Sequence, residues 1–186
     1  MKRGASNDVP MVRVWDPLLR ILHWSLVASV TLAWITSEAG RRWHEPVGWV
    51  VVGIVVLRVL WGLIGPRHAR FTAFVRGPRA VVGYASRIAG HTAPRYLGHN
   101  PLAGWMIVAL LATLAAVGAS GWLMTTEAYF GSEVVEELHE ALAQGLLGLV
   151  ALHVAGVFFT GWHQAENLVR AMWTGRKREP APGDRA

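Results

Sequence analysis

The sequence has 186 residues, enough for one domain, and only 16% of them are charged, against roughly a quarter in an ordinary soluble protein. Hydrophobic residues make up 53% of the chain, and the formal net charge is +6. This composition argues against a water-soluble protein. The absence of cysteine excludes disulfides, iron–sulfur clusters and covalently attached c-type haem.

Four apolar stretches account for the low charge. Residues 21–37, 46–65, 101–126 and 141–165 contain a single charged side chain, that of Arg58. Each stretch is close to the ~20 residues that a helix needs to cross a ~30 Å hydrocarbon core. The polar segments between them are too short to cover the helices of a large soluble core. We therefore expect an all-α integral membrane protein, a bundle of four spanning helices.

The charged residues are distributed unevenly between the connections. Residues 66–100 contain six arginines and no acidic residue, and both chain ends are also basic. The first connection has only two basic residues, Arg41 and Arg42, and residues 127–140 contain five glutamates and no base. By the positive-inside rule, both termini and the long second connection are cytoplasmic in a multi-pass inner-membrane protein. The basic charge thus reports topology, and we expect no nucleic-acid partner.

The first helix is expected after a lead of residues 1–16, which we interpret as disordered or surface-lying. Asp16 followed by Pro17 is a cap-and-first-turn signal. A cleaved signal peptide is a poorer interpretation, because the first apolar stretch is long enough to span and carries His23 and Trp24. The second helix is expected to open at His44 to Pro46.

Residues 67–100 form the long connection, in which 80–88 are expected to form a short amphipathic helix on anionic headgroups. Asn100 and Pro101 repeat the cap signal before the third helix, in which Gly104 and Gly118 would permit close packing. The fourth helix is expected to begin about a turn before His139. It closes a membrane domain of residues 17–175, and we expect residues 176–186 to be a disordered tail.

Histidines in or at the ends of the spans are the candidate functional residues. His139 and His153 are 14 residues apart, which places them within about 40° of one helix face and about 21 Å apart along the axis. Each has a partner that we expect at the same depth in the membrane on another helix. His44 is the partner of His139 on the outer side, and His23 is the partner of His153 on the inner side. Because a six-coordinate haem b takes one axial ligand on each face, this arrangement predicts two haem sites. A single interfacial histidine, such as His44 alone, would more simply be read as a headgroup contact or a cap.

Three further residues are candidates for secondary contacts. Arg58 lies 14 residues after His44, on the same helix face, and could pair with a haem propionate or extend to the headgroups; the sequence leaves both open. His99 and His163 lie toward the cytoplasmic side and could bind a quinone or a propionate, or compete with His23 as ligands.

With these residues in hand, the sequence resembles the small prokaryotic cytochrome b561-type family, which includes the cytochrome b subunits of nickel–iron hydrogenases. The resemblance covers most of the chain. It is carried by Trp15-Asp16-Pro17 with Arg20, His23-Trp24, Arg58 with Trp61-Gly62, Gly98-His99-Asn100-Pro101, the pair His139 and His153, Glu166-Asn167-Leu168, and Gly175-Arg176-Lys177. It implies two non-covalent haems b, a four-helix bundle, quinone reduction or oxidation, and a periplasmic partner such as a hydrogenase small subunit or a cytochrome c. The short connection after the first helix makes docking to a large hydrogenase less secure.

The sequence therefore favours a diheme electron carrier of the respiratory chain, working between the quinone pool and a redox partner as a subunit of an oxidoreductase. One alternative is a stand-alone quinone-linked enzyme acting on a small substrate such as superoxide, although the outer glutamates would repel an anion. The other is a haem-free membrane anchor or transporter.

Overall fold

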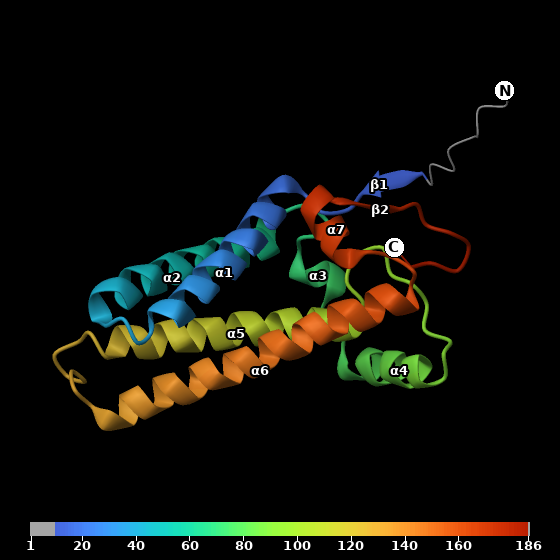
Figure 1. Cartoon of the computed structure of the whole chain (residues 1–186). Helices are drawn as coiled ribbons and strands as arrows, with labels where there is room; N and C mark the ends of the chain where they lie inside the picture. Colours follow the sequence, from blue (N-terminus) through green and yellow to red (C-terminus); the bar gives the residue numbers. More distant parts are fainter. Residues whose placement is uncertain (1–9, 186) are drawn as a thin grey trace.

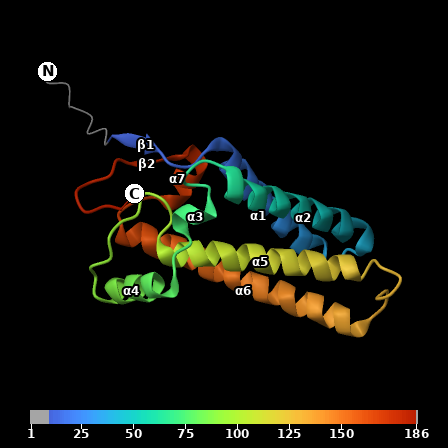
Figure 2. The ribbon, with the colours of Figure 1, turned by 180° about the vertical axis from the view of Figure 1, so that it is seen from behind.

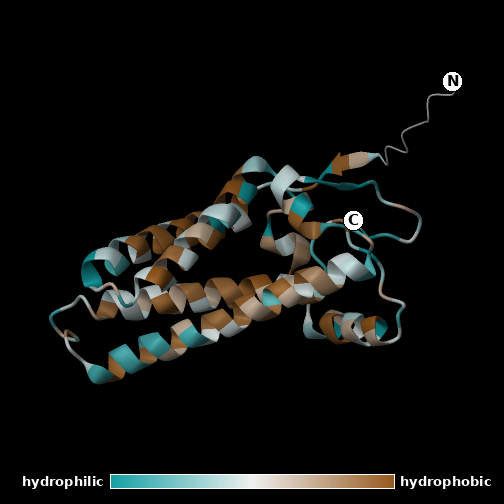
Figure 3. Cartoon of the chain, in the orientation of Figure 1, coloured by the Kyte–Doolittle hydropathy of each residue, from teal (hydrophilic) through white to brown (hydrophobic). Residues whose placement is uncertain are grey.

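Four long helices form the body of the protein (Figure 1). In the computed structural model, which describes residues 10–185, they are α1 (Pro17–Thr36), α2 (Arg41–Ile64), α5 (Pro101–Leu123) and α6 (Glu133–His163). All four are long and apolar enough to cross a membrane. Hydrophobic residues dominate their middles, and polar residues gather at their ends (Figure 3). The expected all-α four-helix bundle is confirmed.

Short elements gather at one end of the bundle. They are β1 (Met11–Arg13), α3 (Phe71–Phe74), α4 (Pro78–Ala89), α7 (Leu168–Thr174) and β2 (Arg176–Arg178). We call this the terminal end, and we call the opposite end, where α1 joins α2 and α5 joins α6, the hairpin end (Figure 1). Of the short elements, only the helix at α4 was expected from the sequence.

Capping residues set the helix starts. The Asp16 carboxylate accepts the N–H of Leu19 at 3.0 Å, and the Asn100 amide oxygen accepts the N–H of Ala103 at 2.9 Å, as the cap signals predict. The second helix begins earlier than expected, at Arg41. Gly40 turns the chain at φ 87°, and its carbonyl accepts the N–H groups of Trp43 and His44, so His44 lies inside the first turn.

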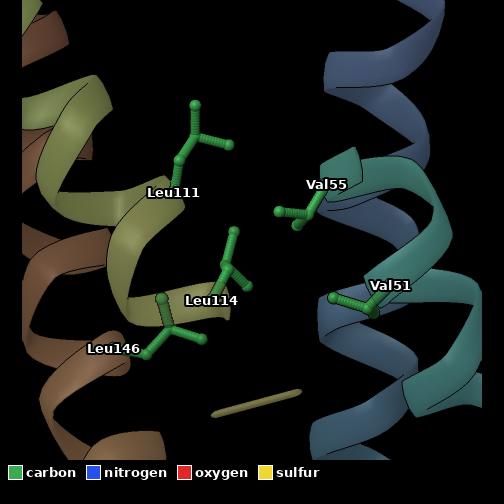
Figure 4. Close-up of a cluster of buried hydrophobic side chains, with 5 residues drawn as sticks. All are labelled: Val51, Val55, Leu111, Leu114 and Leu146. Atoms are coloured by element: carbon green, nitrogen blue, oxygen red, sulfur yellow. The ribbon is translucent and has the colours of Figure 1, made fainter. Parts of the chain in front are cut away.

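Helix packing is sequential: α1 packs against α2, α2 against α5, and α5 against α6. Within the described chain, α6 has no comparable contact with α1 or α2. Five buried side chains join α2, α5 and α6 in one apolar cluster, in which they point toward one another (Figure 4); they are Val51, Val55, Leu111, Leu114 and Leu146. The bundle is thus held together at mid-height while α6 stays separated from α1.

The C-terminal segment is ordered over the part that the structure describes. Residues 176–178 form β2, which pairs antiparallel with β1, and Arg185 forms a bridge with Tyr96. This differs from the expectation of a disordered tail. The lead behaves similarly from residue 10 onward, since Val14 and Trp15 are each 5% exposed; residues 1–9 and 186 lie outside the described residues.

A buried ionic network holds this segment. Arg95 contacts Glu166 at 2.9 Å and Asp184 at 2.5 Å, and Lys177 lies 3.4 Å from Glu166. Burial alone would raise the pKa of Glu166, but the hydrogen bonds from Arg95 and the charge of Lys177 outweigh it, and the pKa is lowered. No local sequence pattern reveals the network, because 71 residues separate Arg95 from Glu166.

Candidate functional site

The predicted histidine partners lie together at the hairpin end. The ring centres of His44 on α2 and His139 on α6 are 6.1 Å apart, and the ring planes are at 90°. The two helices do not pack against each other within the described chain, so the imidazoles face one another across the space between them.

The second predicted pair lies toward the terminal end. The ring centres of His23 on α1 and His153 on α6 are 6.5 Å apart, with 62° between the planes. In both pairs, a histidine of α6 therefore lies opposite a histidine of the α1–α2 hairpin. Their separation along α6 is 14 residues, or about 21 Å of helix.

Both distances fit two imidazoles sharing one metal ion. A histidine nitrogen binds a metal at about 2 Å, so two rings on opposite sides of one ion have centres about 6 Å apart. The described residues contain no group of three or more metal-ligating side chains. A porphyrin would complete the coordination of an ion held by either pair, because it supplies four nitrogens. The residues present thus fit haem b.

Hydrogen bonds orient both histidines of the hairpin-end pair. His44 Nδ1 lies 2.9 Å from the carbonyl oxygen of Ala33, which can only accept, so Nδ1 carries the proton. His139 Nδ1 lies 3.0 Å from Ser120 Oγ, whose own proton goes to the Val117 carbonyl at 3.0 Å. In both rings this assignment leaves the Nε2 lone pair free to bind a metal.

Gly121 gives His139 its space. A Cβ at this position would lie 3.2 Å from His139 Cε1, tighter than a normal contact. Neither Ser120 nor Gly121 was identified from the sequence. A serine within an apolar spanning stretch is a signal that the sequence offers. Its burial, at 3% exposed, and its link to His139 depend on how α5 and α6 pack.

An apolar layer separates the two histidine levels. His44, Val51 and Arg58 follow one another at seven-residue intervals on α2, and His139, Leu146 and His153 do so on α6. Val51 and Leu146 both belong to the buried cluster. Each helix thus presents one face with a polar group at either level and an aliphatic group between them.

Arg58 faces the protein interior. Its side chain is 5% exposed and lies over the Phe71 ring at 5.3 Å, so it does not extend to the surface. Its Nη1 has no hydrogen-bond partner among the described residues. A buried guanidinium nitrogen without a partner is costly, and a ligand carboxylate such as a haem propionate would satisfy it.

The two secondary histidines have different surroundings. His99 packs between Trp15 and Phe74, with ring centres at 4.5 and 4.9 Å, and its Nδ1 is buried without a partner among the described residues. Burial and the nearby charges of Arg58 and Lys177 lower the pKa of His99 to about 3, so the ring is neutral. His163 stacks on Phe159 and lies 6.5 Å from His91. Among the described residues, the ring contact of His153 is with His23.

The remaining residues of the family resemblance build the terminal end. Asp16 also accepts the indole N–H of Trp61 at 3.1 Å, which ties the start of α1 to the end of α2. Arg20 donates to the carbonyls of Met172 and Trp173, and the carbonyl of Gly175 accepts two N–H groups from the chain before α1. These motif residues brace the helix ends on which His23 and Arg58 are carried.

Four spanning helices with inward-facing histidines paired at two levels define a membrane cytochrome of the b type. The family comparison agrees: residues 14–175 match the model of the prokaryotic cytochrome b561 family, and the chain belongs to this family. Comparisons with curated proteins and with solved structures return no match. The protein is therefore a multi-pass b-type cytochrome of the inner membrane that binds haem b and takes part in electron transfer. Family membership disfavours a haem-free anchor or transporter.

Proposed function

We propose that the protein is a diheme cytochrome b that carries electrons across the membrane between the quinone pool and a periplasmic redox partner. The observation that carries the proposal is the pairing of four histidines at two levels, with ring centres 6.1 and 6.5 Å apart. Haem b supplies one-electron redox chemistry when it is bound.

The chain's own part is to hold and tune the two sites. His44 and His139 would bind one haem iron, and His23 and His153 the other. Arg58 and His99 would offer donors to a propionate or a quinone at the terminal end, where both have buried nitrogens without partners among the described residues. His163, half-buried beside Phe159, is a further quinone contact to test.

The orientation and partners form the second part of the proposal. The arginine-rich terminal end is assigned to the cytoplasm and the hairpin end to the periplasm. The five glutamates at the hairpin end are all exposed and would favour a basic partner such as a cytochrome c. Because the chain lacks cysteine, single cysteines at Ser86 and Ser132 can be labelled in intact cells. Only the one at Ser132 should react with an impermeant maleimide; the reverse result would invert the assignment.

Haem content of ligand variants tests the central proposal. The wild type should hold two haems per chain, and His139→Ala and His153→Ala should each hold one. His44→Ala with His139→Ala should still hold one, because both changes affect one site, whereas His23→Ala with His139→Ala should hold none. His91→Ala, at an exposed histidine, should retain both.

The two double variants distinguish which histidines share a haem, because changes at one site should leave one haem and changes at both sites should leave none. A pyridine haemochrome assay normalised to protein gives the counts. One haem in the wild type would refute the diheme proposal. Two haems in both the His139→Ala and His153→Ala proteins would refute the ligand assignment.

A further inference from the structure

Beside α4 is a pocket that the proposed function does not use. It has a volume of about 200 Å³ and is lined by Arg79, Gly83, Tyr84, Arg87, Tyr96 and Arg185, among others. Three arginines, two from α4 and one from the C-terminal segment, thus line one small cavity. The pocket lies between α4 and the segments that carry Tyr96 and Arg185. The helix α4 itself lies at the terminal end, beside the start of α5 (Figure 2).

Helix geometry aligns the first two arginines. Arg79, Gly83 and Arg87 are spaced at four-residue intervals on α4, which puts them on one side of the helix. A Cβ at Gly83 would meet no atom within 4 Å, so the surface between the two arginines is open.

Arg185 completes the pocket from the C-terminal segment. Its backbone is fixed by two hydrogen bonds of 2.8 Å, one to Leu97 and one to Arg95. Its guanidinium lies over the Tyr96 ring at 6.0 Å, and Tyr96 packs edge-on against the buried Tyr84. Burial raises the pKa of Tyr84, so its phenol keeps its proton as a hydrogen-bond donor.

The described residues do not neutralise the charge of these arginines. Within residues 10–185, Arg79, Arg87 and Arg185 form no ion pair. The sequence has no acidic residue between Glu45 and Glu127. The nearby carboxylates, Glu166 and Asp184, are already paired with Arg95 and Lys177. The pocket is therefore an uncompensated anion site with a charge suited to a phosphate.

The surroundings favour a phosphate that carries acyl chains. Val82, on the flank of α4 beside Arg79, is 69% exposed, so an apolar side chain adjoins the cationic pocket. Trp105, at the start of a spanning helix, donates its indole N–H to the carbonyl of Arg76 at 2.8 Å, which places the start of α4 at the membrane interface. We propose that this arginine pocket binds the phosphate of an anionic phospholipid headgroup.

Binding of phosphatidylglycerol to the full-length protein tests the proposal, which does not depend on the haem assignment. The delipidated protein in detergent is titrated with phosphatidylglycerol or phosphatidylcholine and examined by native mass spectrometry. We expect preferential binding of phosphatidylglycerol, weakened about tenfold to thirtyfold in the Arg79→Gln/Arg87→Gln variant. Arg185→Gln should also weaken the binding of phosphatidylglycerol, because Arg185 lines the pocket from the C-terminal segment.

The matched control is Arg67→Gln/Arg70→Gln, which removes two exposed arginines from the same connection but not from the pocket. It should bind like the wild type. Equal losses in the two double variants, or no preference over phosphatidylcholine, would overturn the proposal. Displacement of the lipid by millimolar inorganic phosphate would overturn the lipid assignment and give the pocket to a soluble phosphate.

Discussion

Ser120 is the residue on which the tautomer of His139 depends. Because its hydroxyl proton is donated to Val117, its oxygen must accept from His139 Nδ1. A hydrogen bond of this kind makes an imidazole a more basic ligand. With two haems bound as proposed, Ser120→Ala should keep both but raise the potential of the hairpin-end haem, by an amount on the order of tens of millivolts.

A redox titration of the variant would measure this shift. The terminal-end haem serves as the internal control and should not move. Ser120→Thr keeps the hydroxyl and should restore the wild-type potential. A variant with unchanged potentials would show that Ser120 only fills space.

Arg58 should act on the other proposed haem, at the terminal end. Its buried positive charge, next to Phe71, stabilises an electron added nearby. Arg58→Leu should lower the potential of the terminal-end haem by tens of millivolts or more, and Arg58→Lys should restore part of the loss. The same titration, with the hairpin-end haem as reference, reports the effect. An equal shift of both potentials would point to a general loss of packing.

Among the elements, the seven-residue spacing of α2 and α6 is the feature that organises the site. Leu146 lies midway between His139 and His153 and is 6% exposed, in contact with the cluster from α2 and α5. Leu146→Ala should lower the free energy of unfolding by about 2 kcal/mol or more, because it leaves a cavity, while both histidine levels remain. Thermal unfolding in detergent, with haem content alongside, tests this prediction.

Leu152→Ala is the control for that variant. It makes the same change on the same helix, but Leu152 is 59% exposed and faces outward. Its stability should stay close to that of the wild type. If both substitutions destabilise the protein equally, the mid-height cluster has no special part in holding the bundle.

The spans and the two histidine levels could be predicted because both follow from local rules. Apolar runs of spanning length are visible in the sequence, and the rise per residue fixes the depth of His153 relative to His139. The partners of the imidazole Nδ1 atoms could not be predicted, since Ser120 and Ala33 reach them only after neighbouring helices have packed at a particular rotation. The interior position of Arg58 was one of two options that depth alone left open.

For the molecule as a whole, the terminal end was the least predictable part. The strands β1 and β2 have three residues each and are held by side chains such as Arg95, Glu166 and Asp184, which come from distant parts of the chain. A tail rich in charge and proline resembles a disordered segment until its buried ion pairs are known. Because one ionic network holds the C-terminal segment, a change in the network should alter the stability of the whole segment.

Glu166 should control how firmly the tail is held. Glu166→Gln leaves Arg95 and Lys177 buried with one carboxylate, that of Asp184, so the amides of Leu97 and Arg185 should exchange hydrogen about tenfold faster or more at pH 7. Exchange measured by mass spectrometry, corrected for the intrinsic rate, reports the change. Glu140→Gln, at an exposed glutamate of α6, is the control and should behave like the wild type.

The same tail should loosen in acid. The pKa values of Glu166 and Asp184 are lowered in the folded protein from ordinary values of 4.5 and 3.8. As the pH falls below these ordinary values, the unfolded state binds more protons than the folded state. The stability that the two carboxylates supply is therefore complete at neutral pH and is lost as the pH drops through the lowered pKa values. Protection of the tail amides should be constant between about pH 7 and 5 and decline below the ordinary pKa of 4.5. Loss of protection already near pH 6 would instead implicate a histidine, such as His68 or His99, in holding the terminal end together.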